Sequence, residues 1–103
     1  MRAALAKSAD IARCGFSHRA CGYTLSYRAD RAGYRWTRFG ENIAYGTGSP
    51  PPSARTIFAA WLRSGEHRAN ILDPAFRDIG VGSRRGVVAG ASARLWVAEF
   101  GRH

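Results

Sequence analysis

Residues that interrupt regular structure recur along the chain and keep each helix or strand short. Glycine frees the backbone and proline removes a hydrogen-bond donor, so both end regular elements. The interruptions are Gly15, Gly33, the run 46–52 (Gly-Thr-Gly-Ser-Pro-Pro-Pro), Gly65 and the pair Asp73-Pro74. The longest stretch without a charged residue, 42–54, contains three prolines. The sequence therefore predicts a fold of short elements and no membrane-spanning helix.

Four of the segments between these interruptions are typical of helices: 2–13, 24–32, the stretch from Ser53 and 66–72. The first is rich in alanine and free of glycine and proline, and it should end at Gly15. Ser53 is a natural N-cap for the third, which has apolar and small residues at helical spacing. The members of that stripe are Ile57, Ala60, Trp61 and Ser64.

Three other segments favour strands. Residues 34–46 are rich in aromatic and β-branched side chains, and we expect an extended segment interrupted at 40–42. Residues 79–82 and 95–100 alternate in polarity, and the small residues of 86–93 are expected to join them as a hairpin. Helices come first and strands last, so the predicted class is α+β in a single domain, 1–103.

The chain is globular in composition and strongly basic. Hydrophobic residues make up 46% and charged residues 22% of its 103 residues, which excludes general disorder. Its net charge is +9, and fifteen of its sixteen basic residues are arginine. Such a surface attracts polyanions, yet the arginines are spread from Arg2 to Arg102. We therefore expect a solvated basic surface without specific nucleic-acid binding; a module that binds wall polymers or other polyanions is an alternative.

Two cysteines, Cys14 and Cys21, are the only ones in the sequence. Their spacing matches neither a Cys-x-x-Cys redox motif nor a zinc knuckle. A disulfide closing this loop would stabilise the fold by about 2.5 kcal/mol and would require an oxidising compartment. A pair of free thiols is the alternative. The first residues lack the apolar run of a secretory signal, which leaves open a cytoplasmic protein or a missing N-terminus.

His18, Glu41 and His67 are the candidate residues for chemistry. Two imidazoles and a carboxylate that converge in a cleft would form an open site for zinc or a similar divalent ion. Surface histidines are the alternative. Ser-His catalysis is disfavoured, because the sequence shows neither a nucleophile elbow nor an orienting third group.

Four stretches of the sequence, in order, resemble the CAP superfamily (cysteine-rich secretory proteins, antigen 5 and pathogenesis-related proteins) in its short bacterial form. They are Phe16-Ser17-His18, Gly40-Glu41-Asn42-Ile43-Ala44, the segment from Trp61 to Leu72 with His67-Arg68-Ala69-Asn70-Ile71-Leu72, and Ile79-Gly80-Val81-Gly82 with Trp96-Val97-Ala98-Glu99-Phe100-Gly101. The resemblance covers almost the whole chain. It implies a three-layer α-β-α sandwich around an antiparallel sheet, with Trp61 and Trp96 in the core.

The resemblance also implies a cleft with two histidines and two glutamates. His18, Glu41 and His67 match three of these positions, while Ser64 stands where the second glutamate is expected. Glu66 is near that position without matching it. By this resemblance His18 and His67 would be metal ligands, Glu41 would orient an imidazole or polarise water, and the cleft would be lined by Glu41, Ser64, Glu66 and Asn70.

The resemblance favours an extracellular, monomeric, non-enzymatic binding module for a divalent cation, zinc or another, and a small, lipid or cell-wall ligand. A metal-dependent hydrolase with Glu41 as general base is the alternative. Family members are exported, and the first helix here begins late. We therefore expect a truncated N-terminus, with the first helix shortened.

Overall fold

The computed structural model describes residues 2–103. Its elements follow the order helices, strand, helices, hairpin. They are α1 (Ala3–Cys14), the 3₁₀ turn η1 (Ala20–Gly22), α2 (Tyr27–Arg31), β1 (Arg38–Thr47), α3 (Ala54–Leu62), α4 (Gly65–Leu72), β2 (Asp78–Val88) and β3 (Ala91–Arg102). The predicted α+β class is confirmed.

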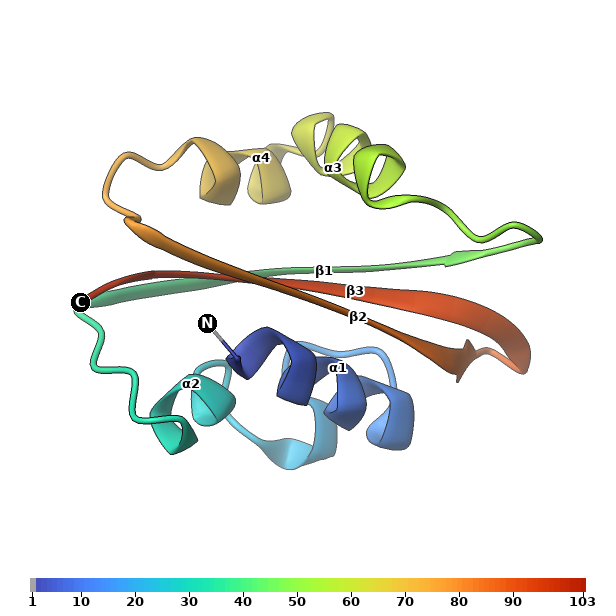
Figure 1. The fold of residues 1–103 in the computed structure, drawn as a ribbon, viewed down its shortest axis with the longest axis horizontal. Coiled ribbons are helices and arrows are strands. Elements are labelled where there is room, and N and C mark those ends of the chain that lie inside the picture. Colours follow the sequence, from blue (N-terminus) through green and yellow to red (C-terminus); the bar gives the residue numbers. More distant parts are fainter. Residues whose placement is uncertain (1) are drawn as a thin grey trace.

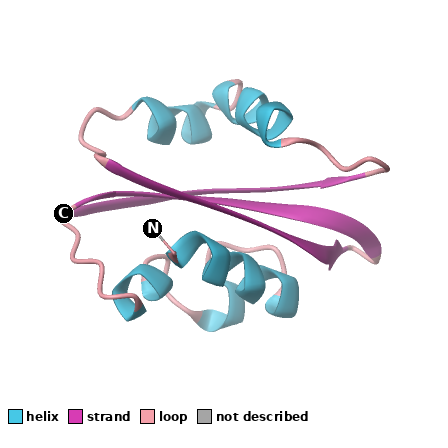
Figure 2. Ribbon diagram, viewed as in Figure 1, coloured by secondary structure: helices cyan, strands magenta, loops and turns pink. Residues whose placement is uncertain are grey.

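The three strands form one antiparallel sheet in the order β1-β3-β2, with β3 in the centre. Helices α1 and α2 cover one face of this sheet, and α3 and α4 cover the other (Figure 1). Colouring by secondary structure separates the two helical layers from the strands between them (Figure 2). The chain is thus a three-layer α-β-α sandwich, as the resemblance implies.

Alternation along β3 sends successive side chains into two separate cores. Leu95 and Val97 face α1, together with Ile43 of β1. Ala98 and Phe100 face the other layer. There they meet the stripe that α3 presents to the sheet, whose buried members are Ile57 and Trp61. Each helical layer therefore has its own apolar contact with the sheet.

Gly82 of β2 lets α1 approach the sheet at backbone distance. A Cβ atom on Gly82 would lie 2.6 Å from the backbone nitrogen of Leu5 and 2.7 Å from the carbonyl carbon of Ala4. Backbone atoms cannot move aside as a flexible side chain can, so only glycine fits here. This contact sets the height of α1 above the sheet.

The predicted helices after the proline run are confirmed, but two members of the predicted stripe are not: Ala60 is exposed, and Ser64 follows the end of α3 as the N-cap of α4. Ser53 is the N-cap of α3, where its hydroxyl accepts a hydrogen bond from the backbone N–H of Thr56. Trp61 is buried and donates from its indole nitrogen to the carbonyl oxygen of Ile43 in β1. Trp96 is half-buried and packs against the same core, so both tryptophans have the packing role expected of them.

The expected interruption at residues 40–42 is wrong, because β1 runs unbroken through them. Each of the three residues pairs with a residue of β3. Gly40 has no Cβ atom, and this leaves room for the side chains of Phe76 and Asn70, which pack closely against it. The prediction treated Glu41 and Asn42 as breaks in the strand. Instead, Glu41 bonds to His18 on one side of the sheet and Asn42 bonds to α4 on the other, so pairing continues.

Two other boundaries differ from prediction. The hairpin strands extend through most of 86–93, and the turn between them is confined to residues 89 and 90. The residues of 86–93 on either side of this turn are paired between β2 and β3, and the last pair before the turn is Val88 with Ala91. The second helix begins at Tyr27 rather than near residue 24, because a turn closed by the Tyr27 N–H and the Thr24 carbonyl precedes it.

A disulfide joins Cys14 at the end of α1 to Cys21 in η1, which confirms the predicted bridge over free thiols. It closes the loop that contains His18. Within residues 2–103, no helix combines the length and the apolar character needed to cross a bilayer.

Candidate functional site

Four ionisable side chains meet between α1 and the sheet: Lys7, His18, Glu41 and Glu99, here called the carboxyl cluster. Oε1 of Glu41 lies 2.8 Å from Nδ1 of His18, and Oε2 lies 3.5 Å from Nζ of Lys7. Nζ of Lys7 also donates to the carbonyl oxygen of His18. Lys7, Glu41 and Glu99 are buried, whereas the His18 side chain is 49% exposed. The cluster thus reaches solvent through His18.

Secondary structure places these groups together. Lys7 follows Ala4 by three positions and precedes Ile11 by four, so it lies on the inner face of α1. Glu41 and Glu99 are directly opposite in the β1–β3 ladder, and both point to the α1 side. The Cys14–Cys21 disulfide fixes both ends of the loop that carries His18.

The surroundings of Glu99 favour its protonated form at neutral pH. Its burial, and then the neighbouring charge of Glu41, raise the pKa of Glu99 to about 10, while Lys7 acts in the opposite direction. Two carboxylates this close cannot both ionise beside a single ammonium group. Within residues 2–103, neither Oε2 of Glu41 nor Oε2 of Glu99 accepts a hydrogen bond from another type of residue, although Oε2 of Glu41 forms an ion pair with Lys7. The proton on Glu99 lets the two carboxyl groups bond to each other, which also raises the pKa of Glu99.

The contact with Glu41 determines how His18 presents its ring. A carboxylate can only accept a hydrogen bond, so Nδ1 of His18 carries the proton that it donates to Glu41. The neutral ring then keeps its lone pair on Nε2. A carboxylate that holds Nδ1 in this way makes Nε2 a better base and a better metal ligand.

His67 belongs to a second group, on α4. Its Nδ1 lies 2.9 Å from the hydroxyl of Ser64, and its backbone carbonyl accepts from Nδ2 of Asn42 at 3.0 Å. Asn70 donates from Nδ2 to Oδ1 of Asn42 at 2.9 Å and to the carbonyl of Glu41 at 3.2 Å. These bonds fasten α4 to β1. Glu66 is exposed on the same helix.

The structure therefore brings His18 and Glu41 into direct contact and links Asn70 to the Glu41 backbone. His67 is on α4, which covers the other face of the sheet (Figure 1), and its ring is paired with Ser64. Both histidines adjoin the edge strand β1, His18 through Glu41 and His67 through Asn42. Across residues 2–103, no three His, Cys, Asp or Glu side chains are grouped so as to hold a metal ion.

The donors that remain for a cation are the Nε2 atoms of His18 and His67, since each Nδ1 has an oxygen partner. This orientation suits metal-binding imidazoles. The carboxylate of Glu41 is already engaged by His18 and Lys7. Zinc binding thus stays a prediction, with two imidazoles as its ligands and Glu41 behind one of them.

Sequence reasoning missed Lys7 and Glu99. Lys7 sits at helical spacing with Ala4 and Ile11, on the face that α1 buries. Glu99 continues the inward series Leu95 and Val97 of β3 by the same two-residue step. A charged residue in phase with buried apolar neighbours was the available signal for both.

A family model described as "Cysteine-rich secretory protein family" (CAP) matches residues 1–100. The uncharacterized protein YkwD of Bacillus subtilis (strain 168) is 33% identical over 101 residues, which are 96% of this chain and 35% of that protein. The chain thus spans about a third of the length of this curated relative.

Solved structures agree with the family match. An extracellular protein containing a SCP domain from Bacillus anthracis str. Ames superposes with a TM-score of 0.76 at 29% identity, over 98% of this chain and 30% of that one. An outer surface protein from Borrelia burgdorferi gives a TM-score of 0.70 at 18% identity, over 100% and 75% of the two chains, and shares the fold. On its sequence match and its three-layer architecture, the chain belongs to the CAP family, the cysteine-rich secretory proteins.

Proposed function

We propose that this CAP domain is an extracellular binding module, and that the ring of His18 is its principal polar contact with ligand. The ligand set we propose is a divalent cation such as zinc, held by His18 and His67, together with a small or lipid-like molecule. The extracellular assignment draws support from the Bacillus anthracis relative, which is described as an extracellular protein.

One observation carries this proposal: the Glu41 carboxylate is engaged on both sides. It accepts from His18 at 2.8 Å and lies 3.5 Å from the Lys7 ammonium, so it is poorly placed to take a proton from water as a general base. Ser64 provides no second carboxylate at the matching place. The geometry therefore favours a site that orients an imidazole over one that carries out acid–base hydrolysis.

A calorimetric zinc titration near pH 7.5 tests the cation site. We expect one zinc per chain in the wild type and loss of binding in the double variant His18→Ala/His67→Ala. His103→Ala is the matched control, because His103 pairs with Asp78 away from the cluster, and it should bind as the wild type does. Glu41→Gln should weaken binding by about 10–100-fold, since it removes the group that orients His18.

Three results would contradict the proposal. Absence of zinc binding in a protein shown to be folded would exclude the cation site. Turnover of peptide or ester substrates that disappears in Glu41→Gln, while the fold survives, would instead establish the metal-dependent hydrolase. Unchanged zinc affinity in the double variant would place the cation elsewhere on the chain.

A further inference from the structure

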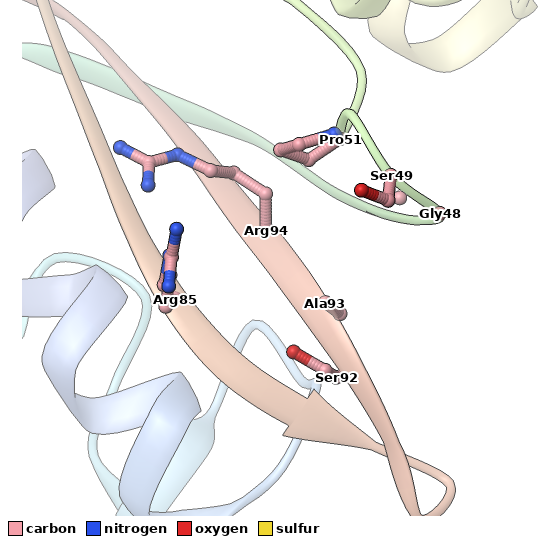
Figure 3. A pocket seen from close by; sticks show the side chains of 8 residues that line it. Gly48, Ser49, Pro51, Arg85, Ser92, Ala93 and Arg94 are labelled. Carbon is pink, nitrogen blue, oxygen red and sulfur yellow. The ribbon is translucent and has the colours of Figure 1, made fainter.

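We propose that a pocket between the β2–β3 hairpin and the loop after β1 binds a phosphate group through Arg85 and Arg94. The pocket has a volume of about 290 Å³ and combines residues from both segments. Its lining residues are Gly46, Gly48, Ser49, Pro51, Arg85, Ser92, Ala93 and Arg94. Figure 3 shows the two arginine side chains next to each other over the strands, with Ser49 and Pro51 on the neighbouring loop. This site is separate from the carboxyl cluster and does not depend on it.

The register of the sheet forces the two arginines together. Arg85 of β2 is directly opposite Arg94 of β3, so both side chains leave the same face of the sheet. Opposite residues in an antiparallel pair have Cβ atoms about 5 Å apart, and like charges at that separation are destabilising. On the other side of Arg94 the register partner is Gly46 of β1, where the missing side chain lets the ring of Pro52 lie close over the strand and brings the loop after β1 next to Arg94.

Arg94 is also held in place. Its Nε donates to the hydroxyl of Ser83 at 2.8 Å, and Ser83 is on the same face of β2, two residues before Arg85. This bond uses the inner nitrogen of the guanidinium group. The two terminal nitrogens of Arg94 therefore remain for a ligand.

Nothing on the described chain neutralises this pair. No Asp or Glu is among the residues that line the pocket. The ion pairs formed within residues 2–103 engage carboxylates elsewhere: Asp10 with Arg28, Asp73 with Arg38, Asp78 with His103, and Glu41 with Lys7. The charges of the exposed Arg85 and the half-buried Arg94 therefore remain available to an anion from solution.

A phosphate group suits this pocket better than a carboxylate. Two guanidinium groups present parallel N–H donors, and a phosphate offers three or more acceptor oxygens that both can share. The hydroxyls of Ser49 and Ser92 add donors at the rim. Pro51 provides an apolar wall for the organic part of a phosphate ester. The ligand class is therefore a phosphate ester, carried by a soluble molecule or by a lipid headgroup.

The test is an amide NMR titration of the whole chain with inorganic phosphate and with glycerol phosphate, against sodium chloride at equal ionic strength. We expect saturable shifts at Gly46, Gly48 and Ser92. Arg85→Gln and Arg94→Gln should each weaken binding at least about tenfold. Arg84→Gln is the matched control, because it removes the same charge from the adjacent position on the opposite face of β2, and it should change affinity less than about twofold.

Co-sedimentation with vesicles identifies the source of the phosphate. Binding to phosphatidylglycerol vesicles but not to phosphatidylcholine, with the same dependence on Arg85 and Arg94, would assign a lipid headgroup. Binding of glycerol phosphate alone would assign a soluble ester. Equal losses in Arg84→Gln and Arg85→Gln would overturn the site in favour of diffuse charge, and so would shifts that chloride reproduces at equal ionic strength.

Discussion

At the scale of single residues, the least expected feature is a neutral glutamic acid inside the sheet layer. Glu99 and Glu41 are directly opposite across β1 and β3, and Lys7 provides one positive charge for two carboxyl groups. Burial and the Glu41 charge raise the pKa of Glu99 to about 10. One proton on Glu99 therefore completes the charge balance of the cluster.

This proton links folding to pH. The unfolded chain releases it above the ordinary pKa of 4.5, whereas the folded chain keeps it up to about 10. The stabilising contribution is therefore complete below pH 4.5 and is lost as the pH rises toward 10. Alkaline solution should destabilise the domain through this residue, with a slope of at most about 1.4 kcal/mol per pH unit.

Glu99→Gln tests this linkage, because glutamine keeps the shape of the protonated acid and cannot ionise. We expect the variant to be more stable than the wild type at pH 8.5, by several and at most about 5 kcal/mol, and within about 1 kcal/mol of it near pH 5. Urea denaturation at both pH values gives the difference. Glu66→Gln, at an exposed site on α4, should retain the wild-type slope. A Glu99→Gln variant with an unchanged slope would show that Glu99 is ionised in the folded state.

At the scale of elements, the docking of α1 on β2 depends on the absence of a side chain. Gly82 touches the backbone of Ala4 and Leu5, and no rotamer change can relieve a clash there. The same helix carries Lys7 and, through its disulfide, the loop with His18. A shift of α1 would therefore move the carboxyl cluster as well.

Gly82→Ala should destabilise the domain by about 1–3 kcal/mol, because the added methyl group forces α1 away from the sheet. Thermal denaturation followed by circular dichroism measures the effect. Gly65→Ala is the matched control: a Cβ atom on this first residue of α4 would have nothing within 4 Å, so that change should be neutral or stabilising. Equal stability of the two variants would mean that α1 adjusts without cost.

At the scale of the whole molecule, cations greatly outnumber anions. Sixteen basic residues face seven acidic ones, and the net charge of +9 is spread over a chain of 103 residues. Close ion pairs such as Asp10 with Arg28 use only part of this charge, and Glu99 contributes none when protonated. Repulsion between arginines should therefore outweigh the ion pairs in the folded state.

Salt should consequently stabilise the domain. We expect Tm to rise between about 20 and 300 mM sodium chloride. Salt screens the repulsion between exposed arginines more than it screens the attraction within the buried pair Lys7–Glu41. Scanning calorimetry in a phosphate-free buffer measures this without filling the proposed phosphate site. Arg84→Gln should show a smaller rise. A Tm that falls with salt would mean that ion pairs dominate the electrostatic balance.

The sequence by itself determined the type and order of most elements and the family, although not every boundary. Glycine and proline ended the segments, the stripe with Ile57 and Trp61 defined the face of α3, and the short spacing of Cys14 and Cys21 indicated their disulfide. The motifs around His18, Glu41 and His67 were enough for the CAP resemblance. All of these signals depend on neighbours within a few positions along the chain, where local geometry is set by residue type.

Only the tertiary structure decided which distant residues meet. Glu41 and Glu99 are 58 positions apart, and whether they are opposite depends on the register between β1 and β3. The pairing of Arg85 with Arg94 and the burial of Lys7 depend in the same way on how strands align and how α1 docks. A shift of one residue in register would reverse the facing of every side chain in a strand. The register is fixed by the packing of the two cores on both faces of the sheet. This packing involves residues far apart in the sequence, so no local sequence pattern predicts it.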